Sequence, residues 1–259
     1  AGLAKHGEFA EEALLKEFMQ QRDLDVYEIL DPLTLTQEQK RAALRAINLL
    51  KEKRNGDLKG RTVADGRKQR PLYTKAETAS PTVSTIALIL TIMIDAFERR
   101  DVATADVAGA YLKAEMDDFV LIKFTGESVD ILLSMEPAYA KFVTYEKGVK
   151  TLYGRLKKAL YGCVKSALLW YKLLQGTLKN MGFAINPYDP CVANCMIEGS
   201  QCTIAWYVDD TKISHVNPDV VTKVIETLEG HFGRMTVTRG REHVFLGMNI
   251  RYNDNRTAT

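Results

Sequence analysis

The stretch CTIAWYVDDTKISHV, residues 202–216, decides how the surrounding chain folds. It predicts two apolar strands, residues 203–208 and 211–216, with only the carboxylate pair Asp209-Asp210 between them at the tip of a hairpin. Tight two-residue turns favour Asn-Gly or Asp-Gly, because their central residues often need positive φ. Two adjacent carboxylates meet that need poorly and repel each other unless a cation binds them. The pair is therefore either a metal site or a solvated polar turn, and residues elsewhere must decide.

The composition is that of a globular protein with nearly balanced charge. Of 259 residues, 35 are Lys or Arg, 33 are Asp or Glu and 46% are hydrophobic, so any nucleic-acid affinity must come from local clusters of cations. The longest apolar run, residues 86–94, is too short to span a bilayer. The chain does not begin with Met, which indicates a fragment or a processed product. The cysteines are too few for a disulfide framework and do not complete a zinc site: Cys163, Cys191, Cys195 and Cys202.

Hydrophobic periodicity predicts the main helices and strands. Apolar residues recur at helical spacing in residues 8–22 and 37–54, and Thr36 would cap the second of these helices. Further helices are predicted over residues 83–99, 165–181 and 218–232. Strands are predicted before Asp106, over residues 119–124, 191–197 and 202–208, and around Arg239-Gly240. Helices on one face of a mostly antiparallel sheet make α+β the preferred fold class.

Residues 57–70, DLKGRTVADGRKQR, form the most basic segment of the chain. Its cations surround a short predicted strand and an Asp65-Gly66 turn: Lys59, Arg61, Arg67, Lys68 and Arg70. Such a hairpin is either a solvated surface or a flap that meets phosphates, with Lys as a point charge and Arg as a fork.

A third carboxylate, Asp106, lies at the end of a predicted strand. If that strand neighbours the hairpin, Asp106 would lie close to Asp209 and Asp210. Nucleotidyl transfer needs such a cluster, because two Mg²⁺ ions about 4 Å apart activate the attacking hydroxyl and hold the leaving oxygen. Carboxylates are the hard oxygen ligands that Mg²⁺ prefers. The three residues therefore point to phosphoryl or nucleotidyl transfer.

Several motifs follow in an order shared with one enzyme family. YVDD at residues 207–210 is a reverse transcriptase signature, and DVAGAY at 106–111 resembles the first catalytic motif, an Asp followed five residues later by an aromatic. ALYG at 159–162 with Trp170-Tyr171 is similar to LYGLKQAPRxWY, GRTVADGRKQR at 60–70 to KARLVARGFKQ, and FLGMNI at 245–250 to the segment that grips the primer. Together they resemble reverse transcriptases of copia-type (Pseudoviridae-like) LTR retrotransposons over about residues 56–252. KGRTVADGRKQR, SPTVST and NPYDPCVAN look most like the lineage seen in diatoms.

The resemblance implies a role for each matching residue. Asp106, Asp209 and Asp210 would be the catalytic metal ligands, joined by the backbone carbonyl of Val107, for two Mg²⁺ ions or Mn²⁺. Tyr111 would be the steric gate against a ribose 2′-OH; the alternative is a core aromatic. Two further sets are implied, one for the incoming dNTP (Lys59, Arg61, Tyr111, Gly162 and Lys165) and one for the primer (Tyr207, Phe245, Leu246 and Gly247).

The second motif departs from the family pattern. It reads LYGCVKSALLWY, with Val164, Lys165, Ala167 and Leu168 where the common form has Lys, Gln, Pro and Arg. Lys165 lies one position beyond the usual Lys, and one helical position turns a side chain by about 100°. Two polar contacts of the common motif are therefore not implied here.

The resemblance also implies the domains and the function. Residues 57–259 would form the fingers and palm of a right-hand polymerase after an N-terminal helical arm, residues 1–56, with the thumb and RNase H absent after Thr259. The expected function is RNA-directed DNA synthesis by a fragment of a retrotransposon Pol polyprotein. Its partners would be RNA and DNA template-primer, dNTPs, and the integrase and RNase H parts of the polyprotein, with no membrane. The expected location is intracellular, in a cytoplasmic virus-like particle or the nucleus.

Two other functions remain open. An inactive or domesticated copy would only bind nucleic acid or a protein partner, and its binding to nucleic acid would be salt-sensitive without incorporation. A palm-type polymerase that copies DNA, or another two-metal nucleotidyl enzyme, would use the same carboxylates. A comparison of RNA and DNA templates separates this second alternative from a reverse transcriptase.

Overall fold

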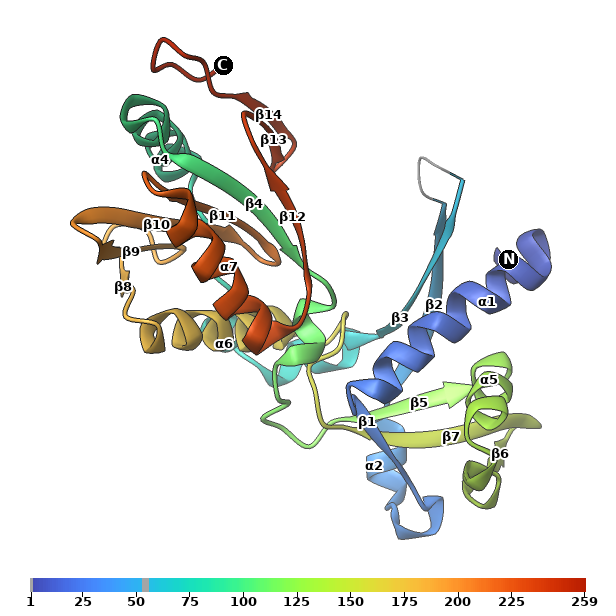
Figure 1. The fold of residues 1–259 in the computed structure, drawn as a ribbon. Coiled ribbons are helices and arrows are strands. Elements are labelled where there is room, and N and C mark those ends of the chain that lie inside the picture. Colours follow the sequence, from blue (N-terminus) through green and yellow to red (C-terminus); the bar gives the residue numbers. More distant parts are fainter. Residues whose placement is uncertain (1, 53–55) are drawn as a thin grey trace. The chain divides into compact units, whose positions relative to one another are not determined.

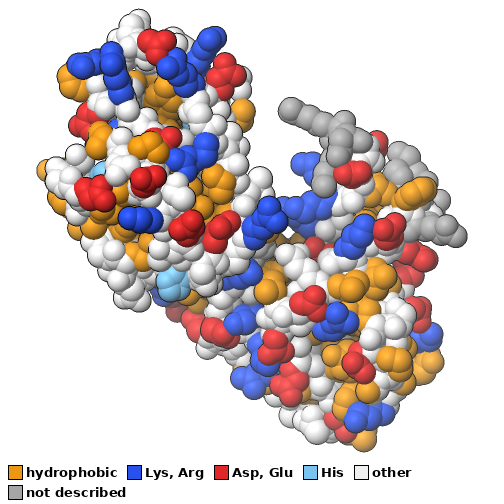
Figure 2. Space-filling view, viewed as in Figure 1, with side chains coloured by type: hydrophobic (Ala, Val, Ile, Leu, Met, Phe, Trp, Pro, Cys, Tyr) orange, Lys and Arg blue, Asp and Glu red, His pale blue; other side chains and the backbone are white. Residues whose placement is uncertain are grey.

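The computed structural model describes residues 2–52 and 56–259, which divide into two compact units (Figure 1). The first unit comprises Ala1–Ala79 and Tyr111–Leu169, and the second comprises Ser80–Ala110 and Trp170–Thr259. Acidic and basic side chains are interspersed over the visible face of each unit (Figure 2), as the near-balance of charge predicts. Among the described residues, no helix is both long and apolar enough to cross a membrane.

The first unit is built on a mixed sheet. Its strands lie in the order β1 (Tyr27–Leu30), β7 (Val149–Leu156), β5 (Leu121–Thr125), β2 (Leu44–Glu52) and β3 (Leu58–Ala64), and β6 (Thr144–Glu146) also pairs with β7. All of these pairs are antiparallel except β2 with β5. The α-helices are α1 (Gly2–Asp23), α2 (Gln37–Ala42), α3 (Lys75–Thr78) and α5 (Glu127–Met135). Among the described residues, four 3₁₀ segments complete the unit: η1 (Pro32–Thr34), η2 (Gly66–Leu72), η3 (Ala110–Lys113) and η4 (Pro137–Phe142). The first residue of η3, Ala110, belongs to the second unit.

Helix α1 packs closely on strand β3. A Cβ atom at Gly60 would lie 2.5 Å from the carbonyl oxygen of Ala13, so only glycine allows this approach. Gly60 and Thr62 are buried on that side, whereas Lys59 and Arg61 point to the exposed side, because successive strand residues alternate between faces. Helix α1 therefore helps to present the two cations. The predicted domain boundary at residue 56 stays a prediction.

The second unit is built on an antiparallel sheet. Its strands lie in the order β12 (Met235–Arg239), β4 (Asp101–Val107), β11 (Asp210–His215), β10 (Ser200–Tyr207), β9 (Val192–Ile197) and β8 (Ala184–Ile185). A separate hairpin joins β13 (Glu242–Phe245) to β14 (Met248–Arg251). The helices of this unit are α4 (Thr85–Glu98), α7 (Pro218–Phe232) and most of α6 (Ser166–Asn180).

Helices pack on both faces of this second sheet. On one face, Tyr171 of α6 contacts Trp206 of β10, with 6.2 Å between ring centroids, and α7 buries its apolar stripe. On the other face, Asp95 of α4 meets Lys212 of β11. Lys212 is the partner of Ala205, the neighbour of Trp206, so the two contacts lie on opposite faces. Helices α6 and α7 follow the predicted one-face arrangement, and α4 adds a helix on the face that carries Asp210.

The α+β class is confirmed, whereas the helix predicted over residues 37–54 is wrong beyond Ala42. Thr36 and Gln39 form the capping box that begins α2, but from Leu44 the chain is strand β2. Its backbone pairs with β3 and β5, and this long-range pairing overrides the local helical spacing of apolar residues. Residues 53–55, where that helix was predicted to end, lie outside the described residues.

The basic hairpin also differs from its prediction. Strand β3 pairs with the preceding strand β2, and Asp65 instead caps η2 by accepting the amide of Arg67 at 3.3 Å. The Arg67 guanidinium pairs with the Asp65 carboxylate at 2.6 Å, and Lys68 Nζ donates to the carbonyl of Arg41 at 2.6 Å. Arg67 and Lys68 therefore make contacts close to the end of β3, whereas Lys59 and Arg61 lie on the exposed side of the strand itself.

Candidate active site

The three predicted metal ligands lie on two paired strands of the second unit. Asp106 of β4 is the direct antiparallel partner of Asp210 of β11. The amide of Val107 donates to the backbone carbonyl of Asp209 at 3.2 Å, which ties the residue before Asp210 to the same strand. Directly opposed residues of an antiparallel pair have Cβ atoms about 4.5–5.5 Å apart. Strand pairing therefore brings Asp106 and Asp210 together, with Asp209 beside them.

The turn of this hairpin lies one residue earlier than predicted. Tyr207 pairs with Asp210, so its central residues are Val208 and Asp209 rather than Asp209 and Asp210. Val208 has φ +57°, which is strained for a β-branched residue. Asp210 is consequently the first residue of a strand, and that position gives it Asp106 as its partner.

Mutual repulsion shapes the electrostatics of the carboxylates. Burial, followed by the negative charges of Asp209 and Asp106, raises the pKa of the Asp210 carboxyl above its ordinary value. Among the residues that the structure describes, no three His, Cys, Asp or Glu side chains are arranged so that they could hold a metal ion. The donors are nevertheless all oxygens, and a divalent cation would relieve the repulsion, so the set fits Mg²⁺ or Mn²⁺. Val107 is the last residue of the strand that carries Asp106, and a metal-binding role for its carbonyl stays a prediction.

In the first unit, Tyr161 joins two residues predicted to bind the dNTP. The Arg61 guanidinium carbon lies 5.0 Å from the centroid of the Tyr161 ring. The Tyr111 ring lies 4.6 Å from the same ring, at an interplanar angle of 40°. The sequence prediction missed Tyr161, and its place in the ALYG motif, next to Gly162, was the signal that could have identified it.

Gly162 is required by a close approach to the end of β3. The amide of Ala64 donates to the carbonyl of Tyr161 at 2.7 Å, and Gly162 has φ +92°. A Cβ atom at Gly162 would lie 2.0 Å from the carbonyl oxygen of Ala64. Backbone packing alone therefore explains this glycine, and its predicted approach to nucleotide and template stays a prediction.

We expect Gly162→Ala to lower the free energy of unfolding by at least about 2 kcal/mol, because it adds both a backbone clash and an unfavourable φ. The matched control is Gly176→Ala in α6, where an added Cβ meets nothing within 4 Å. A helical Gly→Ala change is stabilising by roughly 0.5–1 kcal/mol. Urea unfolding of the two variants measures the difference, and equal midpoints would contradict the packing explanation.

Lys165 is engaged within the first unit. Its Nζ lies 2.6 Å from an Asp117 carboxylate oxygen and 2.9 Å from one of Asp118, and its side chain is 14% exposed. The Tyr73 hydroxyl donates to Asp118 at 2.6 Å. Burial alone would lower the pKa of Lys165, but the two carboxylates outweigh it and raise the pKa. Binding of a dNTP by Lys165 stays a prediction.

The residues predicted to bind the primer lie in the second unit. Tyr207, at the end of β10, is 39% exposed, whereas Phe245 is buried. Leu246 and Gly247 connect β13 to β14, and both have positive φ, as a tight hairpin turn requires. The buried Phe245 side chain therefore anchors a turn formed by the backbone of Leu246 and Gly247. Contact of this turn with a primer stays a prediction.

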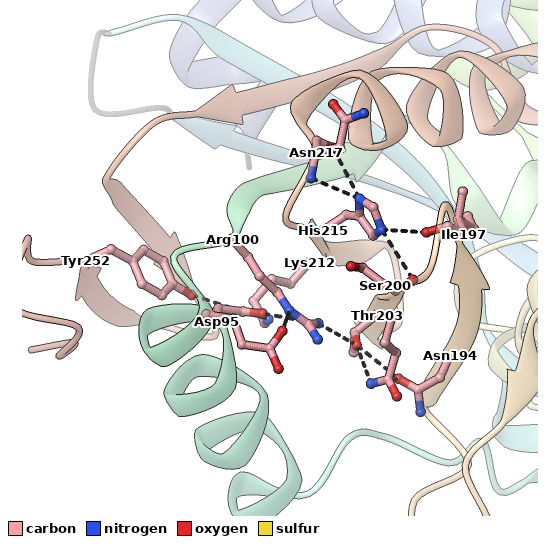
Figure 3. A network of polar contacts seen from close by, with 12 residues as sticks. Asp95, Arg100, Asn194, Ile197, Ser200, Thr203, Lys212, His215, Asn217 and Tyr252 are labelled. Atoms are coloured by element: carbon pink, nitrogen blue, oxygen red, sulfur yellow. Dashed lines mark hydrogen bonds and ion pairs between the residues drawn. The ribbon is translucent and has the colours of Figure 1, made fainter.

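A buried polar network supports the strand that carries Asp210 (Figure 3). Lys212 is fully buried and contacts Asp95 of α4, which also accepts from the Tyr252 hydroxyl at 3.3 Å. Arg100 Nη1 lies 3.9 Å from Asp95 and donates to the Thr203 hydroxyl at 2.9 Å. The sequence prediction missed this network, although a carboxylate ending an apolar run and a lysine inside an apolar strand were signals.

Carboxylates brought together in this way suit the transfer of nucleotidyl groups with two metal ions. Residues 26–258 match the family described as reverse transcriptase (RNA-dependent DNA polymerase). The match covers most of the chain, and the chain belongs to this family.

The relatives that match are retrotransposon polyproteins. The Retrovirus-related Pol polyprotein from transposon RE1 of Arabidopsis thaliana is 26% identical over 191 residues, which are 73% of this chain and 12% of the relative. The Transposon Ty1-LR2 Gag-Pol polyprotein of Saccharomyces cerevisiae is 26% identical over 217 residues, 80% of this chain and 11% of the relative. The chain therefore spans 11–12% of the length of these relatives. The predicted resemblance to retrotransposon reverse transcriptases is confirmed at this level.

Proposed function

We propose that the chain is the polymerase part of a retrotransposon Pol polyprotein and that it catalyses RNA-directed DNA synthesis. The observation that carries the proposal is the register of β4 with β11, which opposes Asp106 to Asp210 and sets Asp209 beside them. The family match over residues 26–258 supports the reaction, and the Pol and Gag-Pol relatives support the polyprotein context.

The carboxylates would hold two Mg²⁺ ions, which when bound activate the primer 3′-OH and stabilise the leaving pyrophosphate. Asp106 and Asp210 would bind them from two paired strands, Asp209 from the turn, and Val107 through its backbone carbonyl. Burial and repulsion favour the protonated form of Asp210, and an entering cation would displace that proton.

The first unit would bind the incoming dNTP. Lys59 and Arg61, on the exposed side of β3, would neutralise charge on the triphosphate. Tyr111, held against Tyr161, would exclude a ribose 2′-OH. In the second unit, the primer would lie against Tyr207 and the turn after Phe245.

The proposal includes the wider setting of the enzyme. Its partners would be dNTPs, RNA and DNA template-primer, and the integrase and RNase H parts of the same polyprotein. Its location would be a cytoplasmic virus-like particle or the nucleus, and three motifs resemble the diatom lineage, namely KGRTVADGRKQR, SPTVST and NPYDPCVAN.

The test is dTTP incorporation on poly(rA)/oligo(dT) and on poly(dA)/oligo(dT). We expect Mg²⁺-dependent incorporation on the RNA template, and a loss of at least about 100-fold in Asp209→Asn, since metal ligands supply several kcal/mol of transition-state stabilisation. Equal incorporation by parent and variant would falsify the assignment. Preference for poly(dA) would favour a DNA-copying polymerase, and salt-sensitive binding without incorporation would favour an inactive copy.

A further inference from the structure

The tip of the catalytic hairpin is held by a hydrogen bond from a neighbouring helix. Trp170 of α6 is 1% exposed, and its indole Nε1–H donates to the backbone carbonyl of Val208 at 2.6 Å. Val208 is the turn residue with φ +57°. The strained residue of the turn and the acceptor of this bond are therefore the same residue.

The bond acts on the peptide group that leads into Asp209. A peptide unit is planar. Fixing the direction of the Val208 carbonyl therefore also fixes the direction of the Asp209 N–H group and of the bond from that nitrogen to the Asp209 Cα atom. On the far side of Asp209, its own carbonyl accepts the Val107 amide at 3.2 Å. The backbone of Asp209 is thus held on both sides, by an indole before it and by a β4 amide after it.

We propose that Trp170 is a positioning residue for the catalytic carboxylates. By holding the Val208 carbonyl, it keeps the turn in the conformation that directs Asp209 toward the Asp106–Asp210 pair. The inference rests on the proposed function for the role of these carboxylates. It concerns the hydrogen bond rather than the bulk of the ring, which also packs edge-on against Phe232 at 5.0 Å.

The same sheet offers a matched comparison. Trp206 of β10 is also 1% exposed, but among the described residues its Nε1 has no hydrogen-bond partner. Replacing either indole by a phenyl ring removes a similar buried volume. Only the change at position 170 removes a bond to the catalytic turn, so the difference between the two variants isolates that bond.

The experiment compares Trp170→Phe and Trp206→Phe in the full chain. Mn²⁺ binding, followed by electron paramagnetic resonance, reports the carboxylates without turnover, and Asp209→Asn shows which binding belongs to them. We expect Trp170→Phe to weaken Mn²⁺ binding by about tenfold, as loss of an outer-shell hydrogen bond typically does, and Trp206→Phe to change it by less than about threefold. In the incorporation assay, kcat should fall in Trp170→Phe with little change in KM for dTTP.

A second variant removes the bond without removing volume. Trp170→3-benzothienylalanine replaces the indole N–H by sulfur, and we expect it to reproduce the weaker Mn²⁺ binding. Equal Mn²⁺ affinity in the parent and this variant would overturn the inference. Equal losses of affinity in the two Phe variants would also overturn it, as would finding that Asp209→Asn binds Mn²⁺ as well as the parent does. The proposed function is judged separately, because it fails if the parent does not incorporate dTTP.

Discussion

Asp210→Asn is expected to impair DNA synthesis severely and, in the same molecule, to stabilise the metal-free fold. Loss of one ligand of the metal site should lower incorporation by about 10³-fold, equivalent to about 4 kcal/mol of transition-state stabilisation. The stabilisation follows from the raised pKa of Asp210, caused by burial and then by Asp209 and Asp106. A carboxyl whose pKa is higher in the folded than in the unfolded state favours folding only while it is protonated.

The sign can be tested by unfolding in urea with EDTA. Stability from the protonated Asp210 is present at low pH and is lost as the pH rises through the raised pKa, so the neutral Asn should be more stable than the parent at pH 7. The advantage should shrink below about pH 4, where carboxyls become neutral. Mg²⁺ should stabilise the parent more than Asp210→Asn. A less stable Asp210→Asn at pH 7 in EDTA would contradict the argument.

Asp254 provides a control of opposite sign. Its carboxylate pairs with Arg241 at 2.6 Å, and the hydrogen bond from that guanidinium lowers its pKa. Asp254→Asn therefore removes a favourable charge instead of an unfavourable one, and no gain in stability is expected at pH 7. Both side chains of that pair are largely exposed, so the change should be small.

Asp95→Asn is expected to lower the free energy of unfolding by about 3–5 kcal/mol, because removing the charge leaves the buried Lys212 ammonium without its carboxylate, whereas Arg100 keeps that of Glu98 at 2.8 Å. Lys212 and Asp95 have fully buried side chains, and Arg100 has a side-chain exposure of 2%. Asn keeps the shape of Asp95 and can still accept the Tyr252 hydroxyl, so the effect isolates the charge. Thermal and urea unfolding measure it.

A double variant separates charge from packing at this position. If the cost comes from the unpaired ammonium group of Lys212, Asp95→Asn combined with Lys212→Met should lose less stability than Asp95→Asn alone. Additive losses in the double variant would show that packing of α4 dominates instead. Asp254→Asn, in an exposed pair, should cost less than about 1 kcal/mol.

Local sequence patterns were sufficient for helices α1, α4, α6 and α7, and insufficient for strand register. All four have apolar periodicity, and α4 and α7 also have N-caps, Ser84 and Asn217, that act within one segment. The turn of the catalytic hairpin was misplaced by one residue, because its position depends on strain accepted at Val208. The carbonyl of that residue is held by Trp170, which lies 38 residues away in the sequence. No pattern within the hairpin contains that information.

The other errors have the same origin. Leu44 and the residues after it fit a helix by spacing, yet they pair with β3, which comes later in the chain. Lys212 and Asp95 are 117 residues apart, so each resembled an isolated polar residue in an apolar segment. Tyr161 is identified as part of the candidate site only by its contacts with Arg61 and Tyr111, which its own segment does not reveal. Pairwise contacts between distant segments decided each case.

The three carboxylates differ in how far their backbones can move. Strand β4 is an inner strand, and at Asp106 it pairs with Asp210 on one side and with Thr236 on the other. Asp106 cannot shift without disturbing its pairing with both neighbouring strands. Asp209, by contrast, lies in the turn between Tyr207 and Asp210, and its carbonyl accepts one hydrogen bond from β4. Asp106 would then be the fixed reference of the site, whereas the place of Asp209 depends on the two hydrogen bonds that hold its turn, from Trp170 and from the Val107 amide.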